Sequence, residues 1–206
     1  MVARLRNIFC GAMVAIVLSG AEWAIAAECP SSQNPKQGFR VSIGSSATSE
    51  VYRLDTGDTR AVERFKGGAI AEKTYYQGLI HTEQLDNGRR TTFTPKSSLK
   101  TLFPLKVGQR HQVAFDVQTA NGQKSELYAE YKVVGKDQIT IGGCRYDVFK
   151  VEHSNGNRKE QMHFIDTEWY SPDLRMILAR EYKRTNGDTI IRKYDAISII
   201  DAGTGK

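Results

Sequence analysis

The chain alternates apolar and polar residues over most of its length. In the segment 110–118, Val113, Phe115 and Val117 alternate with mostly polar neighbours, and the segment 126–133 repeats the pattern. Because successive side chains of a β-strand point to opposite faces, this period of two predicts strands with one apolar and one solvent-facing side. The same pattern predicts further strands at 38–44, 49–55, 60–66, 69–76, 79–85, 89–94, 137–142, 145–153, 158–168, 175–184 and 188–199.

Turn residues separate these segments. Asn and Gly adopt the positive φ angles that tight hairpin turns require, so an Asn-Gly pair between two strands predicts a β-hairpin. Such pairs begin at residues 87, 121, 155 and 186. Two more turns are expected at Asp55–Asp58 and at Gly142–Gly143.

Helix signals are sparse, and the segment 95–102 is expected to form one or two helical turns at most. The alternative of two small domains divided near residue 95 lacks a flexible linker at that point. So many consecutive strands are best accommodated by one curved antiparallel meander sheet that forms an open or closed barrel, because curvature protects the sheet edges. The sequence therefore predicts an all-β fold.

The first residues have the layout of a secretory signal peptide. Arg4 and Arg6 precede an apolar run over 8–18, and small residues follow at 24–27. A membrane anchor is the rival interpretation, but the apolar run ends at Ser19, well short of the roughly 20 residues that span a bilayer. We expect residues 1–27 to be removed and residues 28–206 to form a single exported domain without a transmembrane span.

Export changes the meaning of the two cysteines that remain, Cys29 and Cys144. Disulfides form and persist outside the cytoplasm, so we expect these two residues to be bonded, with two free thiols as the alternative. The chain carries a formal charge of +6, but its basic residues are scattered. The nearest approach to a cluster, Arg89 and Arg90 followed by Lys96 and Lys100, is interpreted as a solvated surface.

Catalytic patterns are not found in the sequence, and no cofactor is expected. His81, His111, His153 and His163 have no metal-ligand spacing, so no metal site is predicted. Asp166 and Glu168 stand two apart, which places both on one face of a strand, and we expect that face to be the solvated outer one. No catalytic residue is assigned.

Aromatic residues are spread through the expected strands. On a curved sheet, large side chains of the concave face either fill the core or line a cavity for an apolar ligand. Export makes nucleic acid an unexpected partner. The candidate ligand-binding residues are Phe115, Tyr131, Phe149, Phe164 and Trp169.

Three segments carry a resemblance to a known group of proteins. They are Phe103–Gly108, with the order Phe-Pro-Leu-Lys-Val-Gly, Gly142–Glu152, with Gly-Gly-Cys-Arg-Tyr-Asp-Val-Phe-Lys-Val-Glu, and Trp169–Leu174, with Trp-Tyr-Ser-Pro-Asp-Leu. Together they resemble uncharacterised periplasmic β-proteins of Gram-negative bacteria over about residues 100–200. The resemblance implies a periplasmic location and a curved antiparallel sheet, distantly like lipoprotein-carrier half barrels or lipocalin-like cups. It implies no catalytic residues.

Two functions from different classes remain open at this point. The first is a non-enzymatic periplasmic protein that binds a lipid, another apolar or envelope-derived ligand, or an envelope protein on its curved sheet. The alternative is a small hydrolase or metal-dependent enzyme that acts on envelope polymers. The first is favoured because the sequence lacks a convergent set of catalytic residues.

Overall fold

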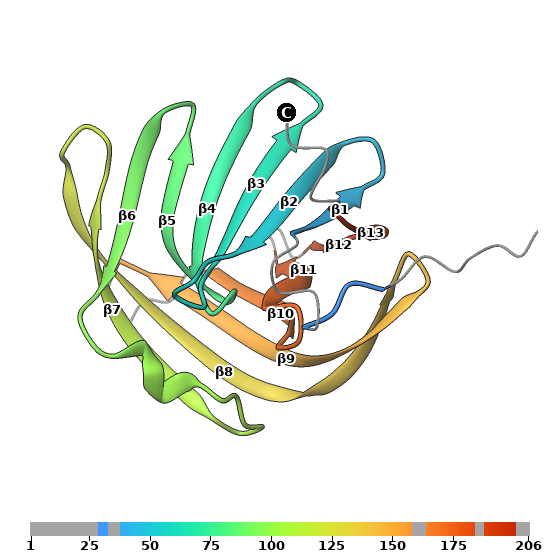
Figure 1. The fold of residues 1–206 in the computed structure, drawn as a ribbon. Helices are drawn as coiled ribbons and strands as arrows, with labels where there is room; N and C mark the ends of the chain where they lie inside the picture. Colours follow the sequence, from blue (N-terminus) through green and yellow to red (C-terminus); the bar gives the residue numbers. More distant parts are fainter. Residues whose placement is uncertain (1–28, 33–37, 158–163, 184–187, 201–206) are drawn as a thin grey trace, which may run out of the picture.

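The structure is a computed structural model that describes residues 29–32, 38–157, 164–183 and 188–200. Thirteen strands of this part form one antiparallel sheet, in which every strand but the last pairs with its neighbour in sequence (Figure 1). The order along the sheet is β12-β11-β10-β9-β8-β7-β6-β5-β4-β3-β2-β1-β13. The strands are β1 (Phe39–Ile43), β2 (Ala47–Arg53), β3 (Thr59–Phe65), β4 (Ile70–Tyr76), β5 (Ile80–Asp86), β6 (Arg89–Pro95), β7 (Arg110–Gln118), β8 (Lys124–Ile141), β9 (Cys144–Gly156), β10 (Phe164–Ser171), β11 (Met176–Lys183), β12 (Thr189–Lys193) and β13 (Ala196–Ile199).

The predicted all-β meander is confirmed, with an open sheet. Among the described residues there is no α-helix, and the segment expected to be helical forms only a short 3-10 helix, η1 (Leu99–Leu102). Ser98 caps η1 by accepting a hydrogen bond from the Lys100 amide. Within the described part of the chain, no helix has the length and apolar character needed to cross a bilayer.

Two predicted strand boundaries are wrong. The segments 126–133 and 137–142 belong to one strand, β8, which continues through an irregularity in its pairing with β9 between Val133 and Gly135. This bulge inserts an extra residue and interrupts the alternation, so the sequence pattern suggests two strands. Conversely, the expected strand 188–199 is divided into β12 and β13 by Tyr194 and Asp195.

Three of the Asn-Gly predictions concern described residues. Asn87 and Gly88 form the β5–β6 turn with positive φ angles of 47° and 80°, as predicted. Asn121 and Gly122 lie in the β7–β8 turn, also as predicted. At Asn155 the predicted hairpin is found, since β9 and β10 pair in the antiparallel sense, but the predicted turn position is wrong. Asn155 pairs with Phe164 and with Ala129, so Asn155 and Gly156 are the last two residues of β9. The fourth pair, at residues 186 and 187, and the predicted signal peptide at 1–27 lie outside the described residues.

The sheet curves so far that a two-residue link joins its two ends. Tyr194 donates its amide proton to Leu178 of β11, while Asp195 donates to Ser42 of β1 and accepts from Gly142. The chain therefore leaves one edge of the sheet in β12 and enters the other in β13. The strands enclose a concave inner face, although β12 and β13 are not hydrogen-bonded to one another (Figure 1).

One end of this curved sheet is closed by loops, and we call it the closed end. It holds the turns 54–58, 77–79, 142–143 and 172–175 and the connection 96–109. The loop 172–175 ties the β10 side to the β2 side, because Arg175 donates from Nη1 to the Gly57 carbonyl over 2.8 Å and Thr59 donates to the Arg175 carbonyl over 3.0 Å. These loops also supply buried leucines to the interior: Leu79, Leu99, Leu102, Leu105 and Leu174.

The disulfide predicted from the sequence is found at the closed end. The Sγ atoms of Cys29 and Cys144 lie 2.06 Å apart, and the two cysteines are 115 positions apart in the sequence. Next to it, the Ser32 amide donates to Asp173 Oδ1 over 3.0 Å. The N-terminal segment is thus fixed to the turn between β8 and β9 and to the loop between β10 and β11.

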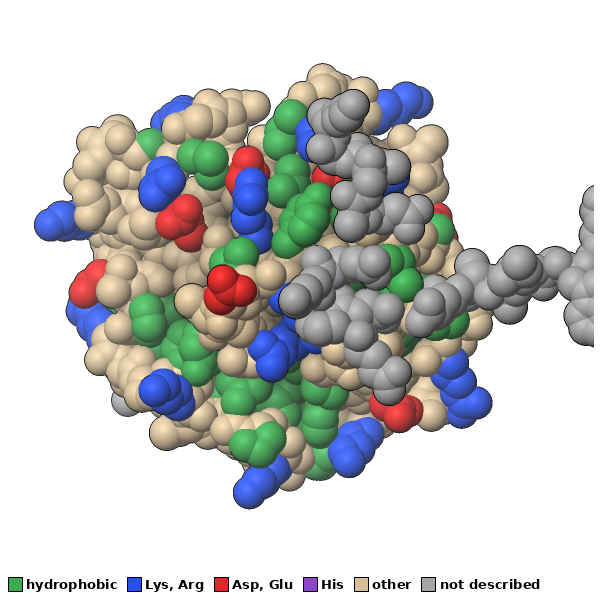
Figure 2. All heavy atoms as spheres, viewed as in Figure 1, with side chains coloured by type: hydrophobic (Ala, Val, Ile, Leu, Met, Phe, Trp, Pro, Cys, Tyr) green, Lys and Arg blue, Asp and Glu red, His purple; other side chains and the backbone are tan. Residues whose placement is uncertain are grey.

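The opposite end carries the hairpin tips 44–46, 66–69, 87–88 and 119–123, and we call it the tip end. Two apolar clusters form the core between the ends. The first cluster centres on β1, β2, β11 and the adjoining ends of β8 and β9, and the second on β7, β8 and the loop leucines. On the face seen in Figure 2, hydrophobic side chains gather in the central and lower part, and Lys and Arg side chains lie mostly around the margin, with a few near the centre.

Candidate functional site

Two acidic residues of β10 point to the inner face of the sheet. Asp166 and Glu168 do share a face, as their spacing predicts, but the expectation that this face is solvated is wrong. Glu168 is only 1% exposed. The reason is the pairing of β10 with β9 and β11, which places Glu168 between Val151, a fully buried residue, and Arg180.

Arg180 of β11 lies opposite Glu168 and forms an ion pair with it. The distance from Arg180 Nη2 to Glu168 Oε1 is 2.6 Å, and His153 Nδ1 lies 3.5 Å from the same carboxylate oxygen. The second carboxylate oxygen, Oε2, and Arg180 Nε are buried without a hydrogen-bond partner among the described residues. A buried polar atom without a partner costs about 1–3 kcal/mol, so this pair keeps hydrogen-bonding capacity that the described protein atoms do not use.

The pair remains charged in spite of its burial. Burial alone would raise the pKa of Glu168, but the Arg180 guanidinium and His153 outweigh this effect and hold the pKa below its ordinary value. Burial would likewise lower the pKa of Arg180, but Glu168 raises it above its ordinary value. Asp166 differs, because burial raises its pKa. The site thus combines a persistent ion pair with a carboxyl group that takes up a proton more readily than usual.

A second ion pair occupies the inner face on β3 and β4. Lys73 Nζ lies 2.7 Å from Glu63 Oε2, and both side chains are half-buried. Tyr75 is near both ion pairs. Burial is the main cause that raises its pKa, and the charges of Glu63, Arg180 and Glu168 also act on this pKa. The two ion pairs therefore belong to one polar region inside the curved sheet.

Tyr194, in the link between β12 and β13, completes this region. Burial raises its pKa to about 12. Of the smaller contributions, the charge of Glu63 raises this pKa and the charge of Arg180 lowers it. The link that joins the two ends of the sheet thus also brings a phenol group to the inner polar region.

Aromatic rings border the polar residues. Tyr131 and His153 are stacked, with centroids 4.5 Å apart and planes 5° from parallel. His81 contacts the ring of Tyr75 at 5.2 Å and that of Phe93 at 4.7 Å. Burial lowers the pKa of His81 to about 4, helped by the nearby charge of Lys73. This imidazole is therefore neutral at neutral pH.

An apolar wall on β6, β7 and β8 adjoins these rings. Phe93 pairs with Val117, and Leu127 pairs with Phe115, whose side chain is buried in the second core cluster. Phe93, Val117 and Leu127 are only partly buried and pack against that cluster. The inner face thus has a polar side, on β3, β4 and β9–β11, and an apolar side, on β6–β8.

Three of the polar residues have the composition of a cation site. His153, Asp166 and Glu168 each bring one ligand atom within 4.8 Å of the others. One imidazole and two carboxylates suit a transition metal ion. However, the guanidinium of Arg180 already contacts Glu168 and supplies a positive charge at the same place. The geometry therefore favours an ion-paired polar site over a metal centre.

The residues predicted to bind a ligand do not lie together. Tyr131 is inside, stacked on His153, and Phe115 is buried in the second core cluster. Trp169 follows Glu168 and so points to the opposite face of β10, where its Nε1 donates to Asp137 Oδ2 over 3.0 Å. Phe149 lines a surface pocket of about 610 Å³ together with Asp137. Only the backbone of Phe164 is described, and it pairs with Asn155.

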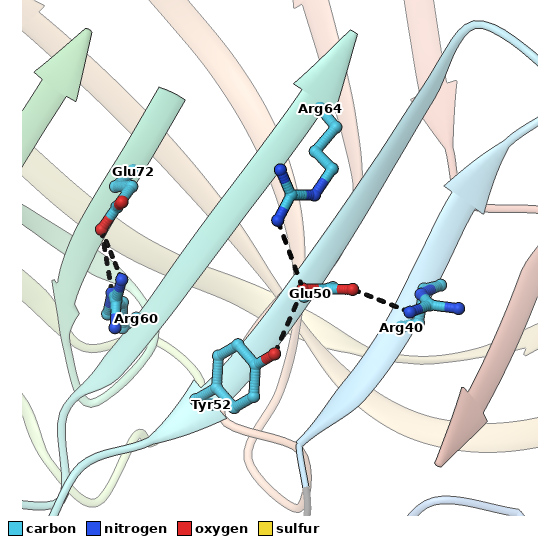
Figure 3. Close-up of polar contacts among 6 residues, drawn as sticks. All are labelled: Arg40, Glu50, Tyr52, Arg60, Arg64 and Glu72. Carbon is cyan, nitrogen blue, oxygen red and sulfur yellow. Dashed lines mark hydrogen bonds and ion pairs between the residues drawn. The ribbon is translucent and has the colours of Figure 1, made fainter. Parts of the chain in front are cut away.

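Charged residues on the outer face of β1–β4 form ion pairs with one another (Figure 3). Glu50 accepts from Arg40 over 2.8 Å and also lies 3.9 Å from Arg64, while Arg60 lies 2.6 Å from Glu72. This arrangement satisfies the charges on the surface and leaves no buried polar atom there without a partner among the described residues. These ion pairs of the outer face are thus a structural feature. The pair between Arg60 and Glu72 provides a control of equal length for the inner ion pair.

Sequence reasoning missed Arg180, Glu63 and Lys73. The sequence did contain a signal for Arg180. This residue is two residues from Leu178 and two from Tyr182, so it lies on the same, otherwise apolar, face of β11. A charge on the apolar side of a strand indicates a buried, paired group.

No protein-family model and no curated protein matches this sequence. Among solved structures, the chain is similar to the hypothetical lipoprotein YmcC from Escherichia coli, with 10% identity and a TM-score of 0.46 over 81% of this chain and 87% of that one. At this identity and TM-score, the likeness assigns neither a family nor a function to the chain.

Proposed function

We propose that this protein is an exported, non-enzymatic protein of the cell envelope that holds an amphiphilic ligand against the inner face of its sheet. The polar group of the ligand contacts the Glu168–Arg180 pair, and its apolar part lies along Phe93, Val117 and Leu127. The cleaved segment 1–27 and a periplasmic location are parts of this proposal.

The observation that carries the proposal is an ion pair on the inner face of the sheet in which the Arg180 side chain remains partly exposed. Arg180 keeps 29% of its side chain exposed although Glu168 beside it is 1% exposed, so a ligand reaches the pair from the Arg180 side. Sites for small molecules typically combine apolar walls with a few convergent polar groups. The inner face has this combination, with Tyr131 and Tyr75 at its border.

Export is supported by the sequence of residues 1–27 and by the disulfide between Cys29 and Cys144, which persists in oxidising compartments. It is tested by the N-terminal sequence of the protein recovered from the periplasmic fraction. A start at or near Glu28 is the expected result. An intact Met1 in the cytosolic fraction would contradict this part of the proposal.

Binding is tested by the fluorescence of 11-(dansylamino)undecanoic acid on titration with the purified protein. We expect saturable binding that undecanoic acid and undecanol displace and undecane does not, because only the first two offer a polar group to Arg180 and Glu168. No binding, or equal displacement by undecane, would contradict the proposal.

Variants of the two matched ion pairs locate the site. Replacing the inner pair together, as Glu168→Gln with Arg180→Met, is expected to weaken dansyl-undecanoate binding at least about tenfold, since hydrogen bonds to charged groups contribute about 1.5–3 kcal/mol. Replacing the outer pair, as Glu72→Gln with Arg60→Met, is expected to leave binding unchanged. Circular dichroism of each variant verifies that the sheet is intact. Unchanged binding in a folded inner-pair variant would place the ligand elsewhere.

A further inference from the structure

Two large apolar side chains are exposed at the tip end of the sheet. Phe65 is 43% exposed and Ile70 is 40% exposed, at the last residue of β3 and the first residue of β4. The turn between them contains Gly67 and Gly68, and the Gly68 amide donates to the Phe65 carbonyl. The hairpin therefore presents an apolar residue on each side of a compact turn.

Basic residues surround this apolar pair. Arg64 and Lys66 adjoin Phe65 in the sequence and are exposed. The neighbouring hairpin tip carries Arg89 and Arg90, which are also exposed. The two tips are adjacent, because Ala71 of β4 pairs with Asp86 of β5, which pairs with Arg89 of β6.

Few acidic side chains neutralise these charges. Over the two tips, 64–70 and 86–90, four basic residues face one acidic residue, Asp86. Arg64 and Arg90 are held loosely, 3.9 Å from Glu50 and 3.7 Å from Glu83. For Lys66 and Arg89, the described part of the chain contains no ion-pair partner within 4.0 Å.

We propose that the adjacent β3–β4 and β5–β6 hairpin tips dock on the surface of an anionic lipid bilayer. Phe65 and Ile70 enter the boundary between headgroups and acyl chains, and Arg64, Lys66, Arg89 and Arg90 contact the acidic headgroups. Exposed apolar residues flanked by Lys and Arg are the combination that binds such interfaces, because apolar burial and electrostatic attraction add. The proposal does not depend on the ligand site, which lies on the inner face.

Docking is tested by sedimentation of the purified protein with vesicles of phosphatidylglycerol and phosphatidylcholine, and with vesicles of phosphatidylcholine alone. We expect binding to the anionic vesicles that decreases as NaCl is added, because salt screens the headgroup attraction. Phe65→Ser with Ile70→Ser, and separately Arg89→Gln with Arg90→Gln, are each expected to weaken partitioning roughly tenfold or more.

Leu54→Ser is the matched control. Leu54 is similarly exposed, at 37%, but it lies at the closed end next to Asp55, so its replacement is expected to leave vesicle binding unchanged. Displacement of dansyl-undecanoate is measured on the same variants and is expected to be unaffected, which separates docking from ligand binding.

Three results would overturn the proposal. The first is no binding to anionic vesicles, and the second is binding that is equal on neutral vesicles or unaffected by the tip variants. The third is dimerisation of the wild-type protein in light scattering that Phe65→Ser with Ile70→Ser abolishes, because the tips would then bind a second copy of the chain. Tip variants that fail to give the circular dichroism of a β-sheet are replaced by Phe65→Tyr with Ile70→Thr, for which the same weakening is expected.

Discussion

Glu168 and Arg180 are directly opposite one another on β10 and β11, and their ion pair is turned to the inside of the sheet. The pair between Arg60 and Glu72 has the same 2.6 Å separation but lies on the outer face (Figure 3). The two pairs have the same separation but differ in burial, since the Glu168 side chain is 1% exposed and that of Glu72 is 35% exposed. They also differ in register, because Arg60 pairs with Thr74 and Glu72 is its diagonal neighbour. Comparing them therefore tests mainly the effect of burial on an ion pair of equal length.

Removing one partner of each pair is predicted to have unequal effects on stability. Arg180→Met leaves the buried Glu168 carboxylate without its partner and should cost about 3–5 kcal/mol, whereas Arg60→Met should cost less than about 1 kcal/mol. Urea unfolding followed by circular dichroism measures both values. Equal losses would show that the inner pair is as well solvated as the outer one.

The pH dependence of stability is predicted to contain a contribution from His81. Burial lowers its folded-state pKa to about 4 from an ordinary value of 6.5, so between these values the unfolded chain takes up a proton that the folded chain does not. The contribution of His81 to the free energy of unfolding is therefore fully present above pH 6.5. It decreases by up to about 3 kcal/mol as the pH falls to 4. His81→Phe, which keeps a ring between Tyr75 and Phe93, should flatten the urea-unfolding profile in this range. An unchanged profile would assign the pH dependence to other groups.

Gly78 is predicted to be among the glycines least tolerant of substitution. A Cβ at this position would lie 1.7 Å from the Arg175 carbonyl oxygen, so the β4–β5 turn and the loop 172–175 could not both keep their positions. Gly88 has a similar φ, 80° against 74°, but nothing lies within 4 Å of its Cβ position. Gly78→Ala should therefore cost at least about 2 kcal/mol more than Gly88→Ala, which meets only the backbone strain of a positive φ. Similar melting temperatures for the two variants would argue against this packing of the closed end.

The disulfide is predicted to stabilise the fold through the long segment that it closes. Cys29 and Cys144 are 115 positions apart in the sequence, and the double variant Cys29→Ala with Cys144→Ala should lose about 2–4 kcal/mol. Mass spectrometry before and after alkylation of the unreduced protein verifies the bond. Two alkylated cysteines in the unreduced wild-type protein would contradict the pairing.

Zinc is predicted not to stabilise the protein. The positive charge of Arg180 beside Glu168 opposes a divalent ion among His153, Asp166 and Glu168, so excess Zn²⁺ should change the melting temperature by less than about 1 °C. A clear rise that His153→Ala removes would instead show a metal site and would favour a metal-dependent enzyme.

The fold class could be predicted from the sequence, because strand alternation and Asn-Gly turns each depend on only a few neighbouring residues. The long strand β8 was divided in the prediction because the bulge near Gly135 shifts the alternation. Asn155 shows the limit of turn signals, since its pairing with Phe164 and Ala129 extends β9.

The site depends on contacts that local pattern does not contain. The spacing of Asp166 and Glu168 places them on one face but does not say which one. Glu168 is inside because β9 and β11 flank it with Val151 and Arg180, and the partners in β3 and β4 join the same region only when the sheet curves. Strand pairing and curvature, not composition, therefore determine the polar region.

The most direct test of the ligand site is the nuclear magnetic resonance signal of the Arg180 guanidinium during titration with undecanoic acid. We predict that this signal, identified by its loss in Arg180→Met, shifts saturably, while the Arg60 guanidinium signal on the outer face remains unchanged. Saturation of the protein with undecanoic acid without any shift of the Arg180 signal would contradict the account.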